Sequence, residues 1–314
     1  MIIVIIIMIV LFILLIILAG PKVKVDTTLT PVKLPADLNL YLANKESDIP
    51  NLTPGTEKTI IWASGKEKKT DYSIIYIHGF TATRQETYPV ADRIASSIGA
   101  NLYYTRLKGH GKDGEALGEA RLKDWINDIW EAWEIGRRIG QKVIIIAVST
   151  GAPLAAWLCT KVDNIAALIM MSANFYPADK ASGMILWPWG NLLIRLVLGK
   201  YHKQFKPINE RHSRYWTSTY RSEALLAMMG VCKLGNKLDL DKIKVPVLFL
   251  YTENDKAISI PALKEVYEKI SSPRKKIINI KEAKDHVIAG DIISPETNNK
   301  VVTLVLDFLE YVLK

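Results

Sequence analysis

Cysteine is almost absent from this sequence, which has only Cys159 and Cys232 among its 314 residues. Two thiols exclude a disulfide-rich scaffold and a multi-cysteine zinc module. Histidine is also scarce, with 5 residues in the chain, and no two histidines have the HxH or HxxxH spacing of a metal site. We therefore expect no metal and no cofactor.

A basic helix with interleaved aromatic residues, the usual sign of a nucleic-acid surface, is also missing. Lysine and arginine total 41 and acidic residues 32, so the net charge is +9, but the lysines are scattered along the chain. We interpret them as a solvated basic surface and expect no nucleic-acid partner. Apolar residues make up 49% of the chain and charged residues 23%, which excludes wholesale disorder.

One long apolar run stands at the N-terminus, where residues 1–19 are apolar throughout and Gly20 and Pro21 end the run. Twenty helical residues span about 30 Å, the thickness of a bilayer core. The run has neither the basic start nor the small-x-small cleavage site of a secretory signal. We therefore predict that residues 1–20 form a transmembrane helix, an uncleaved single-pass anchor that places the protein at a membrane.

The alternative is a signal segment that is cleaved, so that the protein is secreted. The side of the membrane also stays open. Lys22 and Lys24 follow the run, and the positive-inside rule would place the next domain in the cytoplasm. A bias of two charges is too small to decide the topology.

Beyond the apolar run, residues 21–55 are rich in Pro, Asp, Asn and Thr and predict a linker with an irregular entry. In residues 56–314, short apolar runs alternate with amphipathic runs of helical spacing, such as residues 121–139. The apolar runs that we expect to be strands cover residues 74–77, 102–104, 143–148, 165–171, 245–251 and 277–280. Several are apolar throughout, as parallel strands covered on both faces are. The alternation predicts an α/β fold with a doubly wound, mostly parallel sheet.

Residues 173–240 interrupt this alternation, because they separate two expected strands by far more chain than a crossover needs. The segment contains apolar groups such as Trp187-Pro188-Trp189 and Leu192-Leu193-Ile194. We predict a helical insertion that is carried on the sheet.

A candidate nucleophile follows one expected strand, in Ala147-Val148-Ser149-Thr150-Gly151. This is the G-x-S-x-G pattern with alanine in its first position. The small residues allow a sharp strand-to-helix turn that lifts the hydroxyl of Ser149 clear of the sheet. The pattern is weak alone, but the apolar strand before it and the alanine-rich helix after it strengthen the prediction.

Three further segments supply what a nucleophilic serine needs. His-Gly-Phe at 78–80 follows a strand, where the N–H of Phe80 could join that of Thr150 as an oxyanion donor. Asp255 ends a later strand and His286 precedes the last helix. A histidine takes the serine proton and a carboxylate orients the histidine. Glu253 is the fallback for this carboxylate.

With these residues in place, residues 56–314 resemble the α/β-hydrolase family, and most closely its monoacylglycerol lipase-like and carboxylesterase branch. His78-Gly79-Phe80, Gly109-His110-Gly111 and the serine turn carry the resemblance. It implies an α/β-hydrolase fold with Ser149 as nucleophile, Asp255 as acid and His286 as base. The oxyanion donors would be the N–H groups of Phe80 and Thr150.

The resemblance also implies that residues 173–240 form a cap that shapes the substrate pocket. There we expect Trp187 and Trp189 to contact the substrate. The sequence departs from the family pattern at Ala147, where glycine is commoner. His110 is expected to be structural in its turn, and His202 and His212 are expected at the surface.

These observations lead to the hypothesis of a serine ester hydrolase that forms an acyl-enzyme. The apolar cap and the apolar N-terminal segment favour a small-molecule or lipid ester with an apolar acyl group. A thioesterase, amidase or peptidase with the same triad is the alternative. A non-catalytic, membrane-tethered binding protein on a hydrolase fold is a further one. The oligomeric state stays unknown.

Overall fold

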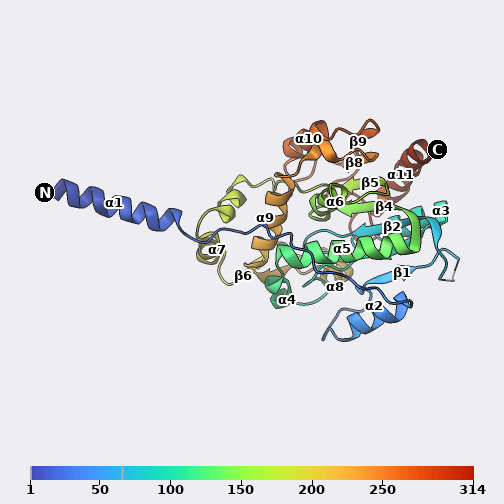
Figure 1. Cartoon of the computed structure of the whole chain (residues 1–314), viewed down its shortest axis with the longest axis horizontal. Coiled ribbons are helices and arrows are strands. Elements are labelled where there is room, and N and C mark those ends of the chain that lie inside the picture. Colours follow the sequence, from blue (N-terminus) through green and yellow to red (C-terminus); the bar gives the residue numbers. More distant parts are fainter. Residues whose placement is uncertain (1, 65–66) are drawn as a thin grey trace.

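The computed structural model describes residues 2–64 and 67–314, so Met1 of the predicted anchor and residues 65–66 lie outside it. A seven-stranded sheet in the order β1-β3-β2-β4-β5-β8-β9 forms the centre (Figure 1). Its strands are β1 (Thr59–Ile61), β2 (Thr70–Ile77), β3 (Asn101–Tyr104), β4 (Gly140–Val148), β5 (Ile165–Met171), β8 (Val247–Tyr251) and β9 (Lys275–Asn279). Within this sheet, as far as the structure describes it, β1 alone pairs antiparallel with its neighbour. This confirms the predicted α/β fold with a mostly parallel sheet.

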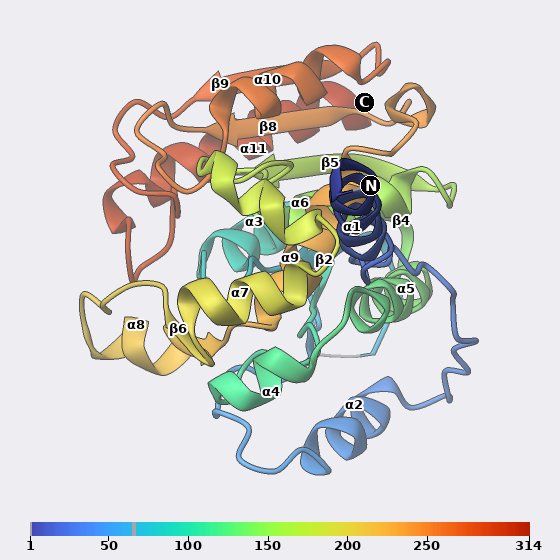
Figure 2. The same ribbon diagram turned by 90° about the vertical axis from the view of Figure 1, so that its left-hand side faces the viewer.

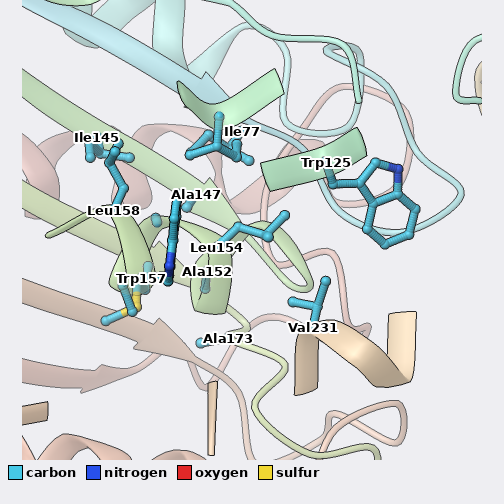
Figure 3. Close-up of a cluster of buried hydrophobic side chains, with 14 of the residues drawn as sticks. Ile77, Trp125, Ile145, Ala147, Ala152, Leu154, Trp157, Leu158, Ala173 and Val231 are labelled. Carbon is cyan, nitrogen blue, oxygen red and sulfur yellow. The ribbon is translucent and has the colours of Figure 1, made fainter. Parts of the chain in front are cut away.

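Helices cover both faces of the sheet, because successive side chains of a strand point to opposite sides. The covering helices are α3 (Val90–Ile98), α5 (Leu122–Ile139), α6 (Gly151–Cys159), α10 (Ile260–Lys269) and α11 (Asn298–Leu313). Ile145 and Ala147 of β4 lie in one core with α5, α6 and α10. Ile144 and Ile146 lie in a second core with α3 and α11. Figure 3 shows part of the first core, with Leu158 of α6.

The segment predicted as an irregular linker contains a helix, α2 (Leu38–Ser47). Asp37 caps it, since its carboxylate accepts a hydrogen bond from the N–H of Leu40 at 2.8 Å. A buried ion pair attaches the helix to the domain, where Nε of Arg106 donates to Oε2 of Glu46 at 2.7 Å. A further short helix, α4 (Gly114–Glu119), follows β3.

Residues 173–240 form a cap beside the carboxyl ends of the strands (Figure 1). Its elements are the 3₁₀-helix η1 (Lys180–Leu186), α7 (Gly190–Leu198), β6 (Tyr201–Lys203), α8 (Glu210–Tyr215), β7 (Thr219–Arg221) and α9 (Ala224–Gly235). The pattern predicted helices here, but β6 and β7 also pair as a small antiparallel sheet. Short 3₁₀-helices follow the cap and precede α11, namely η2 (Leu240–Lys242) and η3 (Pro295–Thr297).

The N-terminal helix α1 (Ile2–Leu18) projects from the end of the molecule that carries the cap, and Figure 2 views that end. Among the described residues, no helix is both long enough and apolar enough to cross a membrane. α1 has 17 described residues, which rise about 26 Å and stand at the short end of the lengths that span a bilayer core. The structure therefore does not support the predicted transmembrane helix.

Candidate active site

Ser149 occupies a strained turn between β4 and α6. Its φ of 50° lies in the left-handed region, which side chains other than glycine rarely adopt. Three backbone hydrogen bonds hold this conformation: the Ser149 N–H donates to the oxygen of Met171 at 2.9 Å, and the N–H groups of Ala152 and Asn174 both donate to the oxygen of Ser149 at 3.0 Å. The turn therefore presents the hydroxyl at the carboxyl end of β4, as the sequence pattern predicts.

The structure brings Ser149, Asp255 and His286 together in one chain of hydrogen bonds. Nε2 of His286 lies 2.8 Å from Oγ of Ser149, and Nδ1 lies 2.7 Å from Oδ2 of Asp255. The other carboxylate oxygen of Asp255 accepts the N–H groups of Ala257 and Ile258. Since an ionised carboxylate only accepts, Nδ1 of His286 carries the proton, and Nε2 is free to accept the serine proton. The fallback acid, Glu253, instead contacts Lys264 at the surface.

The surroundings of His286 strengthen it as a base. Burial by itself would lower the pKa of this imidazole, but the hydrogen bond and charge of Asp255 raise it, with help from Glu86 and Asp285. The net result is a pKa above the ordinary histidine value. An imidazole with a raised pKa holds a proton more firmly once it has taken it from the serine hydroxyl.

Phe80 and Thr150 flank the serine and line the same cavity. Neither backbone N–H donates a hydrogen bond to any residue that the structure describes. Both donors are therefore available to an oxygen that develops negative charge beside Ser149.

Two buried histidines support the loop that carries Phe80. Nε2 of His78 accepts the N–H of Leu107 at 3.1 Å, and Nε2 of His110 accepts the N–H of Thr81 at 3.2 Å. Burial lowers the pKa of His78 to about 4, so its ring is neutral and able to accept this hydrogen bond. His110 has the structural place that the sequence predicts.

A cavity of about 670 Å³ lies between the sheet and the cap, and Ser149 and His286 line it. Its apolar wall comes from η1, α7 and α9 of the cap: Met184, Ile185, Leu193, Ile194, Val197, Leu198, Leu225 and Met228. Its polar lining includes Glu86, His202, Gln204, Lys206, His212 and Lys256. His202 and His212 therefore face the cavity, contrary to their prediction as surface residues, because β6 and α8 fold toward the triad.

Trp187 and Trp189 do not take the predicted place in the substrate pocket. Neither is among the described residues that line the cavity, and the side chain of Trp187 is 59% exposed. The indole Nε1 of Trp189 donates to the oxygen of Ile16 at 3.1 Å, and its backbone N–H donates to the oxygen of Pro21. These tryptophans lie on the outside of the cap, because α7 presents a different set of residues, including Ile194, to the cavity.

Sequence reasoning missed Glu86, a residue that is only 2% exposed and lines the cavity. An acid in the polar loop after β2 has no periodicity or spacing that would single it out. Its burial is a consequence of how this loop packs against the segment that carries His286. No cluster of metal-binding side chains occurs in the described part of the chain.

A mostly parallel sheet, a serine turn after β4 and a cap over the serine together define an α/β-hydrolase. Residues 68–291 match the family described as "Serine aminopeptidase, S33", and the chain belongs to this family.

The relatives of this chain include lipolytic enzymes. It is 23% identical over 222 residues to the thermostable monoacylglycerol lipase of Bacillus sp. (strain H-257), a match that covers 71% of this chain and 85% of the relative. The monoacylglycerol lipase of Paleococcus ferrophilus has a similar structure, with a TM-score of 0.60, 14% identity and coverage of 81% of this chain and 98% of that one. For a soluble variant of the monoglyceride lipase of Saccharomyces cerevisiae the TM-score is 0.62, with 13% identity and coverage of 84% and 97%. The structural likenesses show the shared fold.

Proposed function

We propose that this protein is a serine ester hydrolase with Ser149 as nucleophile, His286 as general base and Asp255 as the residue that orients His286. The observation that carries the proposal is the hydrogen-bonded series from Asp255 through His286 to Ser149, which lines a cavity. A free serine hydroxyl is a poor nucleophile, and this arrangement supplies the base that it needs.

The reaction follows from the placement of the groups. Oγ of Ser149 attacks the ester carbonyl carbon while its proton passes to Nε2 of His286. The N–H groups of Phe80 and Thr150 stabilise the resulting oxyanion. His286 then gives the proton to the leaving alcohol oxygen, and the acyl group stays on Ser149. A water molecule then gives a proton to Nε2 of His286 while its oxygen attacks the acyl carbon. The bond between this carbon and Oγ of Ser149 breaks, His286 returns the proton to Oγ, and the carboxylic acid leaves.

The substrate that we propose is a mono-acyl ester with an apolar chain. The apolar wall from α7 and α9 supports this, and so does the likeness to a monoacylglycerol lipase. Each methylene that the cavity buries contributes about 0.8 kcal/mol, or about fourfold in binding. We expect kcat/KM to rise with acyl length beyond butyryl until the cavity is full.

The experiment is a panel of esters from acetyl to palmitoyl, with and without a glycerol head group, run beside a thioester, an amide and an aminoacyl substrate. Ester turnover should dominate, and a fluorophosphonate should label wild type but not Ser149→Ala. Ser97→Ala, an exposed serine on α3, is the matched control and should react like wild type. Preferred cleavage of the aminoacyl substrate would mean that the protein is a peptidase and not an ester hydrolase. Turnover by Ser149→Ala would contradict the assigned nucleophile.

We further propose that α1 holds the protein at a membrane. Its apolar side chains are exposed, with Ile2 and Ile3 at 72% and 73%, and such surface gains free energy when it leaves water. The full chain should float with lipid vesicles even in high salt, whereas a chain without residues 1–20 should remain in solution and stay active. A mature N-terminus near Pro21 would point instead to a cleaved signal segment.

A further inference from the structure

Glu86 is a buried acid beside the triad that the proposed reaction does not use. It lies in the loop between β2 and α3 and lines the cavity with Ser149 and His286. Its Oε2 accepts a hydrogen bond from the N–H of Gly79 at 2.7 Å. Its Oε1 has no hydrogen-bond partner in the part of the chain that the structure describes. Burying a carboxyl that accepts a single hydrogen bond is costly, which calls for a functional explanation.

The carboxyl and the nucleophile flank the same glycine. A Cβ placed on Gly79 would lie 2.8 Å from Oε1 of Glu86 and 3.0 Å from Cβ of Ser149. Gly79 immediately precedes Phe80, whose N–H is one of the two proposed oxyanion donors. The hydrogen bond from Gly79 to Glu86 therefore fixes the peptide chain one residue before this donor.

The backbone of Glu86 also packs against the segment that follows His286. A Cβ on Gly290 would lie only 2.4 Å from the backbone oxygen of Glu86. Close by, the N–H of Asp291 donates to the oxygen of Tyr88 at 2.9 Å. Glu86 thus stands between the loop that carries Phe80 and the loop that carries His286, and it touches both.

Two titratable groups in the described part of the chain face Glu86: His286 from the loop after β9 and the neutral phenol of Tyr76 from β2. Asp255 and Asp285 face His286 in turn. Burial raises the pKa of Glu86 to about 7, although the hydrogen bond from Gly79 and the charge of His286 oppose this. The carboxyl can therefore change its charge near neutral pH, and its negative form favours the protonated form of His286.

We propose that Glu86 is a positioning residue with two effects: it holds the oxyanion loop through Gly79, and its charge, from the same cavity wall, helps His286 to keep a proton. The proposal rests on the proposed function, because both effects act on groups of the ester hydrolase site. The two effects separate by substitution. Glu86→Gln keeps an oxygen that can accept from Gly79 but removes the charge, and Glu86→Leu removes both.

The test measures kcat, KM and the pH dependence of kcat/KM for a soluble ester. In Glu86→Leu we expect kcat to fall about 10- to 100-fold with KM nearly unchanged, since loss of one oxyanion donor costs about 10²- to 10³-fold and here the donor is only displaced. Glu86→Gln should restore kcat to within about threefold of wild type, because a neutral acceptor still holds Gly79. The acid limb of its kcat/KM profile should move to lower pH, since one of the negative charges that raise the pKa of His286, in addition to that of Asp255, is gone.

Asp92→Asn is the matched control, because Asp92 is a partly buried carboxyl on α3 whose pKa is also raised by burial but which lies outside the cavity. Its pH profile should equal that of wild type. An acid limb in Glu86→Gln at the same pH as in wild type would overturn the charge effect on His286. A wild-type kcat in Glu86→Leu would overturn the positioning of the oxyanion loop. A purely structural role would lower the unfolding temperature without moving the pH profile.

A second measurement does not depend on turnover. Titration of the His286 ring by NMR, with His286→Ala used to assign the signal, should give a lower pKa in Glu86→Gln than in wild type. The same pKa in both proteins would refute the charge effect, even if the protein hydrolysed no ester. Turnover by Ser149→Ala would refute the proposed function, and the NMR titration would still decide the role of Glu86.

Discussion

Replacement of Gly151 by alanine tests whether close packing of two loops controls the oxyanion site. A Cβ at this position would lie 2.7 Å from the backbone oxygen of Ile77 and 2.8 Å from that of His78. Non-bonded carbons ordinarily stay about 3.5–4.0 Å from their neighbours, so one of the two segments must move by about 0.8 Å. The end of β2 is held in the sheet, where Ile77 pairs with Ala147 and is fully buried. The start of α6 and the serine turn must therefore move away from β2.

This movement separates the N–H of Thr150 from that of Phe80. Overpacking costs about 1–3 kcal/mol, and a displacement near 1 Å in a reacting site costs about 100-fold in rate. We expect Gly151→Ala to lower the free energy of unfolding by about 2 kcal/mol, measured by urea denaturation. For a soluble ester, kcat should fall about 100-fold with little change in KM.

The matched control is Gly230→Ala in α9, where the nearest atom to a new Cβ lies 3.4 Å away, an ordinary contact. Alanine is favoured over glycine in a helix by about 1 kcal/mol, so this variant should be as stable as wild type or slightly more stable, with unchanged kcat. If Gly151→Ala matched wild type in both unfolding and kcat, the steric reasoning would be refuted.

Three other measurements probe the site and the scaffold. Ser149→Gly should have a free energy of unfolding about 1 kcal/mol higher than that of Ser149→Ala in urea denaturation, because glycine adopts the φ of 50° without strain. Equal free energies of unfolding would mean that the turn is unstrained. The acid limb of the kcat/KM profile of the wild type should have its midpoint above pH 6.5, since Asp255 raises the pKa of His286 and only the neutral imidazole accepts the serine proton. A midpoint below pH 6.5 would contradict the raised pKa. Asp255→Asn should lower kcat about 10⁴-fold. Glu131→Gln should lower the free energy of unfolding by about 2 kcal/mol in urea denaturation, because buried Lys58 keeps Asp128 at 2.8 Å but loses its second carboxylate at 2.6 Å. Burial opposes ionisation of Glu131, but Lys58 lowers the pKa of this carboxyl to about 2. The ionised carboxylate therefore stabilises the fold above pH 4.5, and this stabilisation is lost as the pH falls toward 2. A free energy of unfolding that does not change over this pH range would refute the role of the ion pair.

The sequence was most informative where structure depends on short segments. The run from Val143 to Val148 is apolar because both faces of β4 are buried, and each of these residues is buried in the structure. The serine turn was recognisable for a similar reason. Its sterics depend on the residues next to Ser149, and the structure gives Ser149 the left-handed φ that the pattern requires.

Predictions found least support where they rested on composition alone. The apolar N-terminal run suggested a membrane-spanning helix, which the described part of the chain does not support. Trp187 and Trp189 are large and apolar, yet they face outward from the cap. His212 was expected at the surface, yet it is 8% exposed and lines the cavity. Hydropathy alone does not say which face of a cap element meets the sheet.

The amino-acid sequence by itself determined six of the seven strand segments of the central sheet, all but β1, together with the mostly parallel α/β fold and the candidates Ser149, Asp255 and His286. Periodicity and turn sterics depend on neighbouring residues, which is why the sequence reveals them. Only the tertiary structure decided which cap residues line the cavity and that Glu86 stands beside the serine. These facts depend on contacts between segments far apart in the chain, such as the packing of Glu86 against Gly290. Such contacts arise from the packing of the whole domain, and no local pattern encodes them.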